Sequence, residues 1–103
     1  MAAPLPPTAH YIRFSLAPAC ADALLVRRAI QDALTQSFGL TASSTYLDIL
    51  WVADSGEEAV VRTGVSDAAR VMAATAVYAG RMRLSVVKES SFLPSLSADG
   101  PVV

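Results

Sequence analysis

A chain of 103 residues with one cysteine is the size of a single domain and excludes an internal disulfide or a cysteine-rich metal site. Its composition, 53% hydrophobic and 17% charged with a net charge of −1, excludes a disordered chain and leaves the surface short of charge. The pI of about 5.6 is acidic, whereas a protein that binds nucleic acid on its own is usually basic. No apolar run approaches the ~20 residues of a membrane span, so we expect no membrane contact.

The two ends of the chain are predicted to be flexible tails. Residues 1–9 carry three prolines, and residues 95–103 carry Gly100 followed by Pro101, which is typical of loose segments. No positively charged region begins the chain, so we expect no signal peptide. One domain is therefore expected over residues 10–94.

The domain begins with a predicted strand. Apolar and polar residues alternate along His10–Leu16, with Ile12 and Phe14 on one face. Tyr11 and Arg13 fall on the opposite face. This alternation indicates a strand that is buried on one side only.

A long helix is predicted over Pro18–Phe38, because proline suits a first helical turn. Apolar residues recur at helical spacing between Val26 and Leu34, and Gly39 is expected to end the helix. Cys20 is interpreted as a small packed side chain at the helix start.

A hairpin follows, with predicted strands Tyr46–Ala53 and Glu58–Thr63. The segment Asp54-Ser55-Gly56 is typical of a three-residue hairpin loop, in which glycine takes the left-handed position. Such a loop places Ala53 opposite Glu57 and therefore fixes every other pair of the two strands.

This register predicts that Asp48 opposes Arg62 and that Leu50 opposes Val60, all on the face turned away from the helices. Trp51 then points toward the helices, and we interpret it as a core residue. For Arg62 a cross-strand pair with Asp48 is the favoured interpretation.

The second helix is predicted to begin at Ser66, a good N-cap, and to end at Gly80. A last strand is expected over Met82–Lys88. The order strand, helix, strand, strand, helix, strand is that of the α+β ferredoxin-like sandwich. We expect a four-stranded antiparallel sheet of order 4-1-3-2 with both helices on one face. The predicted core comprises Ile12, Phe14, Val26, Ile30, Leu34, Ile49, Val61, Met72, Leu84 and Val86.

No residue pattern indicates catalysis, a metal site or a cofactor site. His10 is the only histidine, and it lies beside a predicted tail where a catalytic geometry is hard to hold. The predicted third strand has no aromatic residue, unlike that of an RNA-recognition domain. No glycine-rich anion loop follows the first strand, as an acylphosphatase-like enzyme would need. We therefore expect a non-catalytic protein.

The open sheet face is the predicted contact surface, since interfaces favour tyrosine and arginine around an apolar centre. Phe92 and Leu93 follow the last strand directly, and they either join this surface or fold across the sheet as a third layer. The predicted partner contacts are Tyr11, Tyr46, Leu50, Val52, Val60, Arg62, Val87, Phe92 and Leu93. The predicted RNA contacts are Arg13, Arg83 and Lys88.

Four segments resemble the small-subunit family of eukaryotic ribonuclease P and ribonuclease MRP. They are residues 11–16 (YIRFSL), 29–40 (AIQDALTQSFGL), 59–62 (AVVR) and 84–93 (LSVVKESSFL), in the order of the family. The last of these, with the short length and acidic balance, resembles the Pop-eight branch more than the Pop-five branch.

The resemblance implies a non-catalytic subunit of a ribonucleoprotein in which RNA carries the chemistry. Such a subunit acts in the removal of 5′ leaders from precursor tRNA and in precursor rRNA processing, in the nucleus and nucleolus. It implies pairing with a Pop-five-like subunit beside a barrel-fold subunit. The acidic pI indicates limited direct contact with the ribonuclease P/MRP RNA and, for the isolated chain, weak RNA binding with a shallow salt dependence.

The main alternative is a free-standing dimeric ferredoxin-like module that acts as a binding or sensor domain. Such a module would form a homodimer in pure solution and would carry a ligand pocket near Gly39 or Gly64. A small enzyme on the same fold is a weaker alternative.

Overall fold

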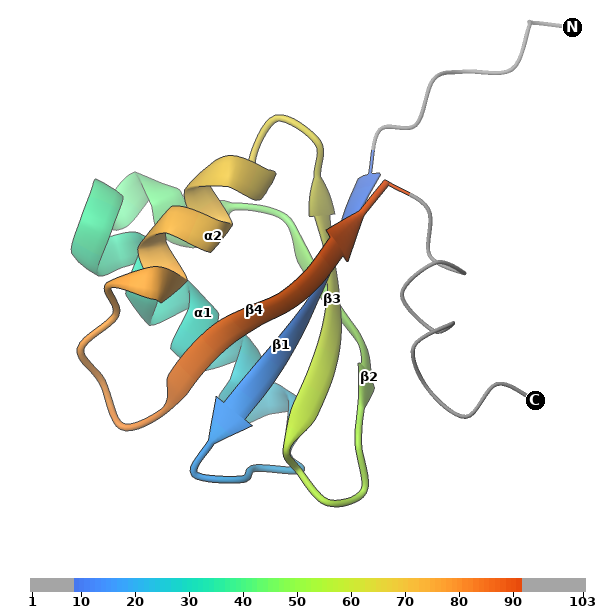
Figure 1. The fold of residues 1–103 in the computed structure, drawn as a ribbon. Helices are drawn as coiled ribbons and strands as arrows, with labels where there is room; N and C mark the ends of the chain where they lie inside the picture. The colour runs from blue at the N-terminus through green and yellow to red at the C-terminus, as the bar shows by residue number, and fades with distance from the viewer. Residues whose placement is uncertain (1–8, 92–103) are drawn as a thin grey trace, which may run out of the picture.

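The computed structural model describes residues 9–91, which form one sheet and two helices (Figure 1). The elements in chain order are β1 (Ala9–Ala17), α1 (Ala23–Phe38), the 3-10 helix η1 (Leu40–Ser44), β2 (Leu47–Val52), β3 (Glu58–Gly64), α2 (Ala68–Ala76) and β4 (Arg83–Ser90). This is the predicted βαββαβ order. Phe92, Leu93 and the two predicted tails lie outside the described residues, except Ala9, which begins β1.

The four strands form one antiparallel sheet in the order β2-β3-β1-β4, as predicted. Both α-helices lie on one side of this sheet, and the described part of the chain leaves the other side uncovered (Figure 1). The architecture is therefore the predicted ferredoxin-like sandwich with an open sheet face.

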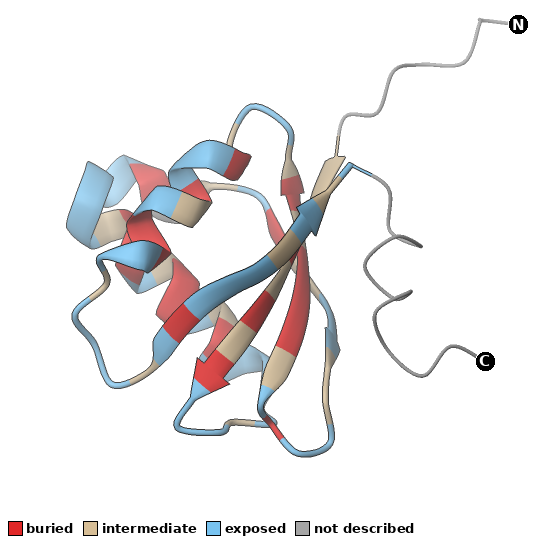
Figure 2. Cartoon of the chain, in the orientation of Figure 1, coloured by how far each residue is buried: buried red, intermediate tan, exposed pale blue. Residues whose placement is uncertain are grey.

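The core lies between the helices and the covered sheet face. Ile12 and Phe14 of β1 are fully buried, as the alternation of that strand predicts, and so is Val61 of β3. Buried positions also follow one stripe of α1 (Figure 2). The other predicted core residues that are buried are Val26, Ile30, Leu34 and Leu84.

Three predicted core residues are less buried than expected. Ile49 and Met72 are partly buried and pack against the core, so they line its margin. Val86 is 41% exposed, and its prediction as a core residue was wrong. The reason is that the end of α2 does not close against this part of β4, since Thr75, Tyr78 and Val86 line a cavity between them.

The first helix begins five residues later than predicted. Pro18 is not in its first turn, and Asp22 is the N-cap, since the Asp22 carboxylate accepts a hydrogen bond from the Leu24 N–H at 2.9 Å. Gly39 ends the helix with a positive φ of 96°, as the sequence indicates.

The loop between β1 and α1 packs on the tip of the β2–β3 hairpin. The Cys20 N–H donates to the Gly56 carbonyl at 2.7 Å, and Cys20 is partly buried against the core. A Cβ atom on Gly56, whose φ is +75°, would lie only 2.7 Å from the Cys20 nitrogen. Gly56 is therefore required both by its backbone conformation and by the close approach of two chain segments.

The second helix also differs from the prediction at both ends. Its N-cap is Asp67, not Ser66, and no side chain caps the helix. Its last residue is Ala76, and a turn through Val77 and Tyr78 follows. Gly80 therefore lies in the connection to β4, where a Cβ atom would overlap the Tyr78 ring.

Candidate functional site: the open sheet face

The open face is defined by residues that alternate with the core along each strand. In β1 these are Tyr11, Arg13 and Ser15, whose neighbours Ile12, Phe14 and Leu16 are buried. The register of β3 brings Arg62 opposite Tyr11, Val60 opposite Arg13 and Glu58 opposite Ser15. Residues that face each other across neighbouring strands project to the same side, so these six share the open face.

A bulge in β2 changes the predicted hairpin register. Asp48 opposes Arg62 and Ile49 opposes Val61, as predicted, but the register shifts between Ile49 and Trp51. Leu50 is the extra residue, so its predicted pairing with Val60 was wrong. The loop is correspondingly one residue longer than predicted, since the Ala53 N–H donates to the Glu58 carbonyl at 2.9 Å.

The bulge exchanges the faces of the next two residues. Trp51 opposes Val60, so it lies on the open face, where it is 48% exposed. Val52 opposes Ala59 and packs against the core. The interpretation of Trp51 as a core residue was therefore wrong, and so was the placement of Val52 on the open face, because one inserted residue inverts the alternation.

Trp51, Val60 and Leu50 form the apolar part of the open face. Val60 is only 8% exposed, because it stands between the larger side chains of Trp51 and Arg13 in the register. Leu50, beside the bulge, is exposed, as is Tyr46 just before β2. These residues place an aromatic and aliphatic surface over β2 and β3.

A charged network borders this apolar surface. The Tyr46 hydroxyl donates to Asp48 Oδ2 at 2.6 Å, and Arg62 Nη2 donates to the same oxygen at 2.6 Å. Arg62 Nε donates to the Tyr46 hydroxyl at 2.9 Å. The predicted cross-strand pair of Arg62 and Asp48 is thus confirmed, with Tyr46 as a third member.

The network shifts the ionisation of its own members. Hydrogen bonds from Tyr46 and Arg62 hold the pKa of Asp48 below its ordinary value. The pKa of Tyr46 is raised, first because its hydroxyl donates to the Asp48 carboxylate. Arg27 of α1 adds a second cation 3.8 Å from Asp48 Oδ1. At neutral pH Tyr46 is therefore neutral, Asp48 is negative and Arg62 is positive. The charges of Asp48 and Arg62 offset each other.

Basic and hydroxyl residues occupy the other half of the face, over β1 and β4. Arg13 Nε donates to Glu58 Oε1 at 2.9 Å, and Arg13 Nη2 contacts the same carboxylate. Lys88 stands opposite Arg13, because the β1–β4 register shifts at this point and Val87 is the extra residue of β4. Further along, Ser15 opposes Ser85.

The predicted contact residues thus fall into two groups. Arg83 pairs with Ala17 at one end of β4, so the three predicted RNA contacts share the β1–β4 half with Val87 at the bulge. The predicted partner contacts on or beside the β2–β3 half are Tyr11, Tyr46, Leu50, Val60 and Arg62. Trp51 is the open-face residue that sequence reasoning missed, because the bulge has no signal where residues 49–52 are all apolar.

The described residues contain no group of three or more His, Cys, Asp or Glu side chains that could hold a metal ion. His10 Nε2 lies 2.6 Å from Glu89 Oε1, and the two form a cross-strand pair between β1 and β4. Within residues 9–91 neither helix is long and apolar enough to cross a lipid bilayer.

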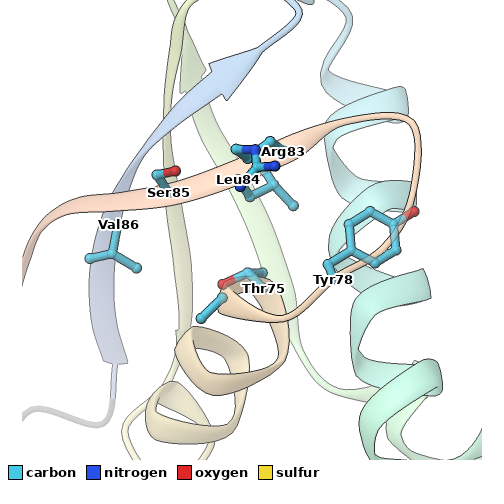
Figure 3. A pocket seen from close by; sticks show the side chains of 7 residues that line it. Thr75, Tyr78, Arg83, Leu84, Ser85 and Val86 are labelled. Carbon is cyan, nitrogen blue, oxygen red and sulfur yellow. The ribbon is translucent and has the colours of Figure 1, made fainter.

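A cavity of about 280 Å³ lies between the end of α2 and the start of β4. Thr75 and Tyr78 line one side and Val86 lines the other (Figure 3). The cavity explains the exposure of Val86, since the side chain faces the space between α2 and β4. Arg83, Leu84 and Ser85 of β4 also line it.

Comparison with known proteins gives one family and one fold. The family described as "Ribonucleases P/MRP protein subunit Pop8" matches residues 10–78. No curated protein sequence matches the chain. A chain in the cryo-EM structure of yeast ribonuclease MRP superposes with a TM-score of 0.72 and 19% sequence identity, over 88% of this chain and 79% of that chain. This likeness shows a shared fold.

Proposed function

Since this chain belongs to the Pop8 family of ribonuclease P/MRP protein subunits, we propose that it acts by holding a protein partner on its open sheet face. Membership makes the chain a protein subunit of an RNA-catalysed ribonucleoprotein, and it confirms the family resemblance. The match spans three of the four segments, and residues 84–93 lie outside it. The complex is a nuclear complex of eukaryotes. Within it, we place this subunit in precursor tRNA 5′ leader removal and precursor rRNA processing, with a nucleolar as well as a nuclear location.

The proposed partner is a related, Pop-five-like subunit, with a barrel-fold subunit beside it. The observation that carries this proposal is the exposed indole of Trp51 next to Leu50 and Val60. Tryptophan, tyrosine and arginine are enriched among the residues that dominate binding energy at protein interfaces. Trp51, Leu50 and Tyr46 are exposed together on β2 or just before it, and a contiguous exposed apolar patch marks a contact surface.

The charges beside Trp51 also favour a protein partner. Arg62 donates hydrogen bonds to Asp48 and Tyr46, so a partner that buries this network does not leave a charge buried without a counter-charge. An apolar centre with a polar, hydrogen-bonded rim is the usual arrangement of a protein interface.

The test is a pair of matched changes on the full-length chain. Trp51→Ala combined with Leu50→Asp should weaken binding to the Pop-five-like subunit by about 30-fold or more, the effect of losing one dominant contact. The control is Val77→Asp, which places the same charge at an exposed apolar position at the end of α2. Affinity is measured by calorimetry, and circular dichroism checks that both variants fold.

Unchanged partner affinity in a folded Trp51→Ala, Leu50→Asp variant would refute the proposal and would move the partner contact to the helices or to a sheet edge. An equal loss in the Val77→Asp variant would show that the effect is not specific to the open face.

A further inference from the structure

Positive charge is concentrated on the open face of an acidic chain. The chain has eight Lys and Arg residues and nine Asp and Glu residues. Four of the basic residues occupy open-face strand positions, namely Arg13, Arg62, Arg83 and Lys88. Among the described acidic residues, only Asp48 and Glu58 do so. The face therefore carries a local excess of positive charge although the whole chain is negative.

This excess lies on the β1–β4 half. Both acidic residues of the face belong to the outer hairpin, where Asp48 binds Arg62 and Glu58 of β3 reaches across to Arg13. Neither β1 nor β4 places an acidic residue on the open face. Arg83 is exposed at the start of β4, and Lys88 stands near its end.

The serine side chains between Arg83 and Lys88 are of a kind that binds phosphate groups. Ser15 and Ser85 face each other across the two strands, midway between the Arg13–Lys88 pair and Arg83. Hydroxyl groups and basic side chains make most of the contacts that proteins form with phosphate oxygens. A protein interface would favour an apolar centre. Here two small hydroxyl side chains stand at the middle of the half, and the exposed Val87 at the bulge is a single apolar side chain beside Lys88.

Arg13 and Lys88 place two cations side by side, at directly opposite positions of neighbouring strands. Glu58 of β3 offsets the charge of Arg13 from the side of the hairpin. A phosphate group over this position would be attracted to both cations.

We propose that the β1–β4 half of the open face binds the sugar–phosphate backbone of RNA. Arg83 and Lys88 contact phosphate oxygens, and Ser15 and Ser85 donate hydrogen bonds to them, while Arg13 keeps Glu58 as its partner and adds charge. The inference rests on the proposed function, since a subunit of a ribonucleoprotein is built against RNA. It divides the face into a protein-binding half over β2–β3 and an RNA-binding half over β1–β4.

The test measures binding of the full-length chain to a fluorescein-labelled 20-nucleotide oligouridine by anisotropy, from 20 to 200 mM salt. The variant is Arg83→Ala combined with Lys88→Ala. The control is Arg28→Ala combined with Arg70→Ala, which removes the same charge from exposed positions on the two helices. The plot of log K against log[salt] should lose a slope of about 1.4 in the variant, because each phosphate contact on a single strand contributes about 0.7. The control should keep the slope of the unmodified chain.

Three outcomes would overturn the proposal. They are no measurable binding by the unmodified chain at 20 mM salt, an unchanged slope in the Arg83→Ala, Lys88→Ala variant, and an equal loss in the control. The same variant is also tested for binding to the Pop-five-like subunit. Loss of that binding with RNA affinity intact would reassign the β1–β4 half to a protein contact. Retained partner binding with a reduced RNA slope supports the division, and Trp51→Ala then tests the β2–β3 half separately.

Discussion

Different interactions fix the side chains on the two faces of the sheet. On the covered face, Ile12, Phe14 and Val61 are fully buried, and their positions follow from the burial of apolar surface. On the open face, order comes from hydrogen-bonded ion pairs such as those of Asp48 with Arg62 and Glu58 with Arg13. Buried apolar contacts carry no charge to titrate or to screen, whereas exposed ion pairs titrate with pH and are screened by salt. The covered face therefore sets stability, and the open face is free to be specialised for contacts.

The largest effect is expected from truncating one side chain on each face. Phe14→Ala should destabilise the fold by about 3–5 kcal/mol, because it removes a fully buried aromatic ring and leaves a cavity. Its neighbour on the open face provides the control, since Ser15→Ala should change stability by less than about 0.5 kcal/mol. Urea denaturation of both variants measures the two values, and similar losses at the two positions would contradict the comparison.

The next test concerns the tip of the β2–β3 hairpin, on which the β1–α1 loop packs. Gly56→Ala and Gly39→Ala both place a side chain at a positive φ, +75° and +96°. Only Gly56 has a neighbour in the way, since nothing lies within 4 Å of a Cβ on Gly39. Gly56→Ala should therefore be the more destabilising change by about 1–3 kcal/mol.

Thermal and urea unfolding of the two glycine variants provide the comparison. Equal destabilisation would mean that backbone conformation alone fixes these positions and that the approach of Cys20 to Gly56 does not constrain the loop.

The smallest effect is expected from pH on the open face. The folded-state pKa of Asp48 is lowered by Tyr46 and Arg62, so the network stabilises the fold fully above the unfolded pKa of about 3.9. That contribution is lost as the pH falls through the lowered pKa of Asp48. An Asp48→Asn variant should therefore lose less stability than the unmodified chain between about pH 5 and pH 2.

The measurement is the urea midpoint at a series of pH values, with the exposed loop residue Asp54 changed to asparagine as the control. The Asp54→Asn variant should follow the unmodified chain. If the Asp48→Asn variant also follows it, the network does not contribute to the acid response.

The sequence predicts the sheet order and most of the core, because alternation and helical spacing report burial directly. It also predicts the Asp48–Arg62 pair, since polar residues mark the face to which this part of β2 belongs. It fails at Trp51 and Val52. Residues 49–52 are all apolar, so no polar side chain marks which of them face outward, and the loop alone cannot reveal an inserted residue.

The helix boundaries show a second limit of the sequence. Pro18 and Asp22 are both suitable residues for a helix start, and the choice depends on the long-range contact of Cys20 with Gly56. Val86 shows the same dependence, because its exposure follows from the cavity between α2 and β4 and not from the pattern of its own strand. Local sequence preferences therefore allow more than one helix start or buried position, and tertiary packing determines which one forms.

Both outer strands of the sheet carry a register shift, at Leu50 in β2 and at Val87 in β4. An outer strand exposes unpaired backbone groups that can recruit strands from other molecules, and an inserted residue bends the strand and interrupts that row of groups. Sheet extension is therefore hindered at both edges at once. Copies of this subunit that have not yet entered an assembly should thus resist stacking into fibrils, while the open face between the two edges stays available for contacts.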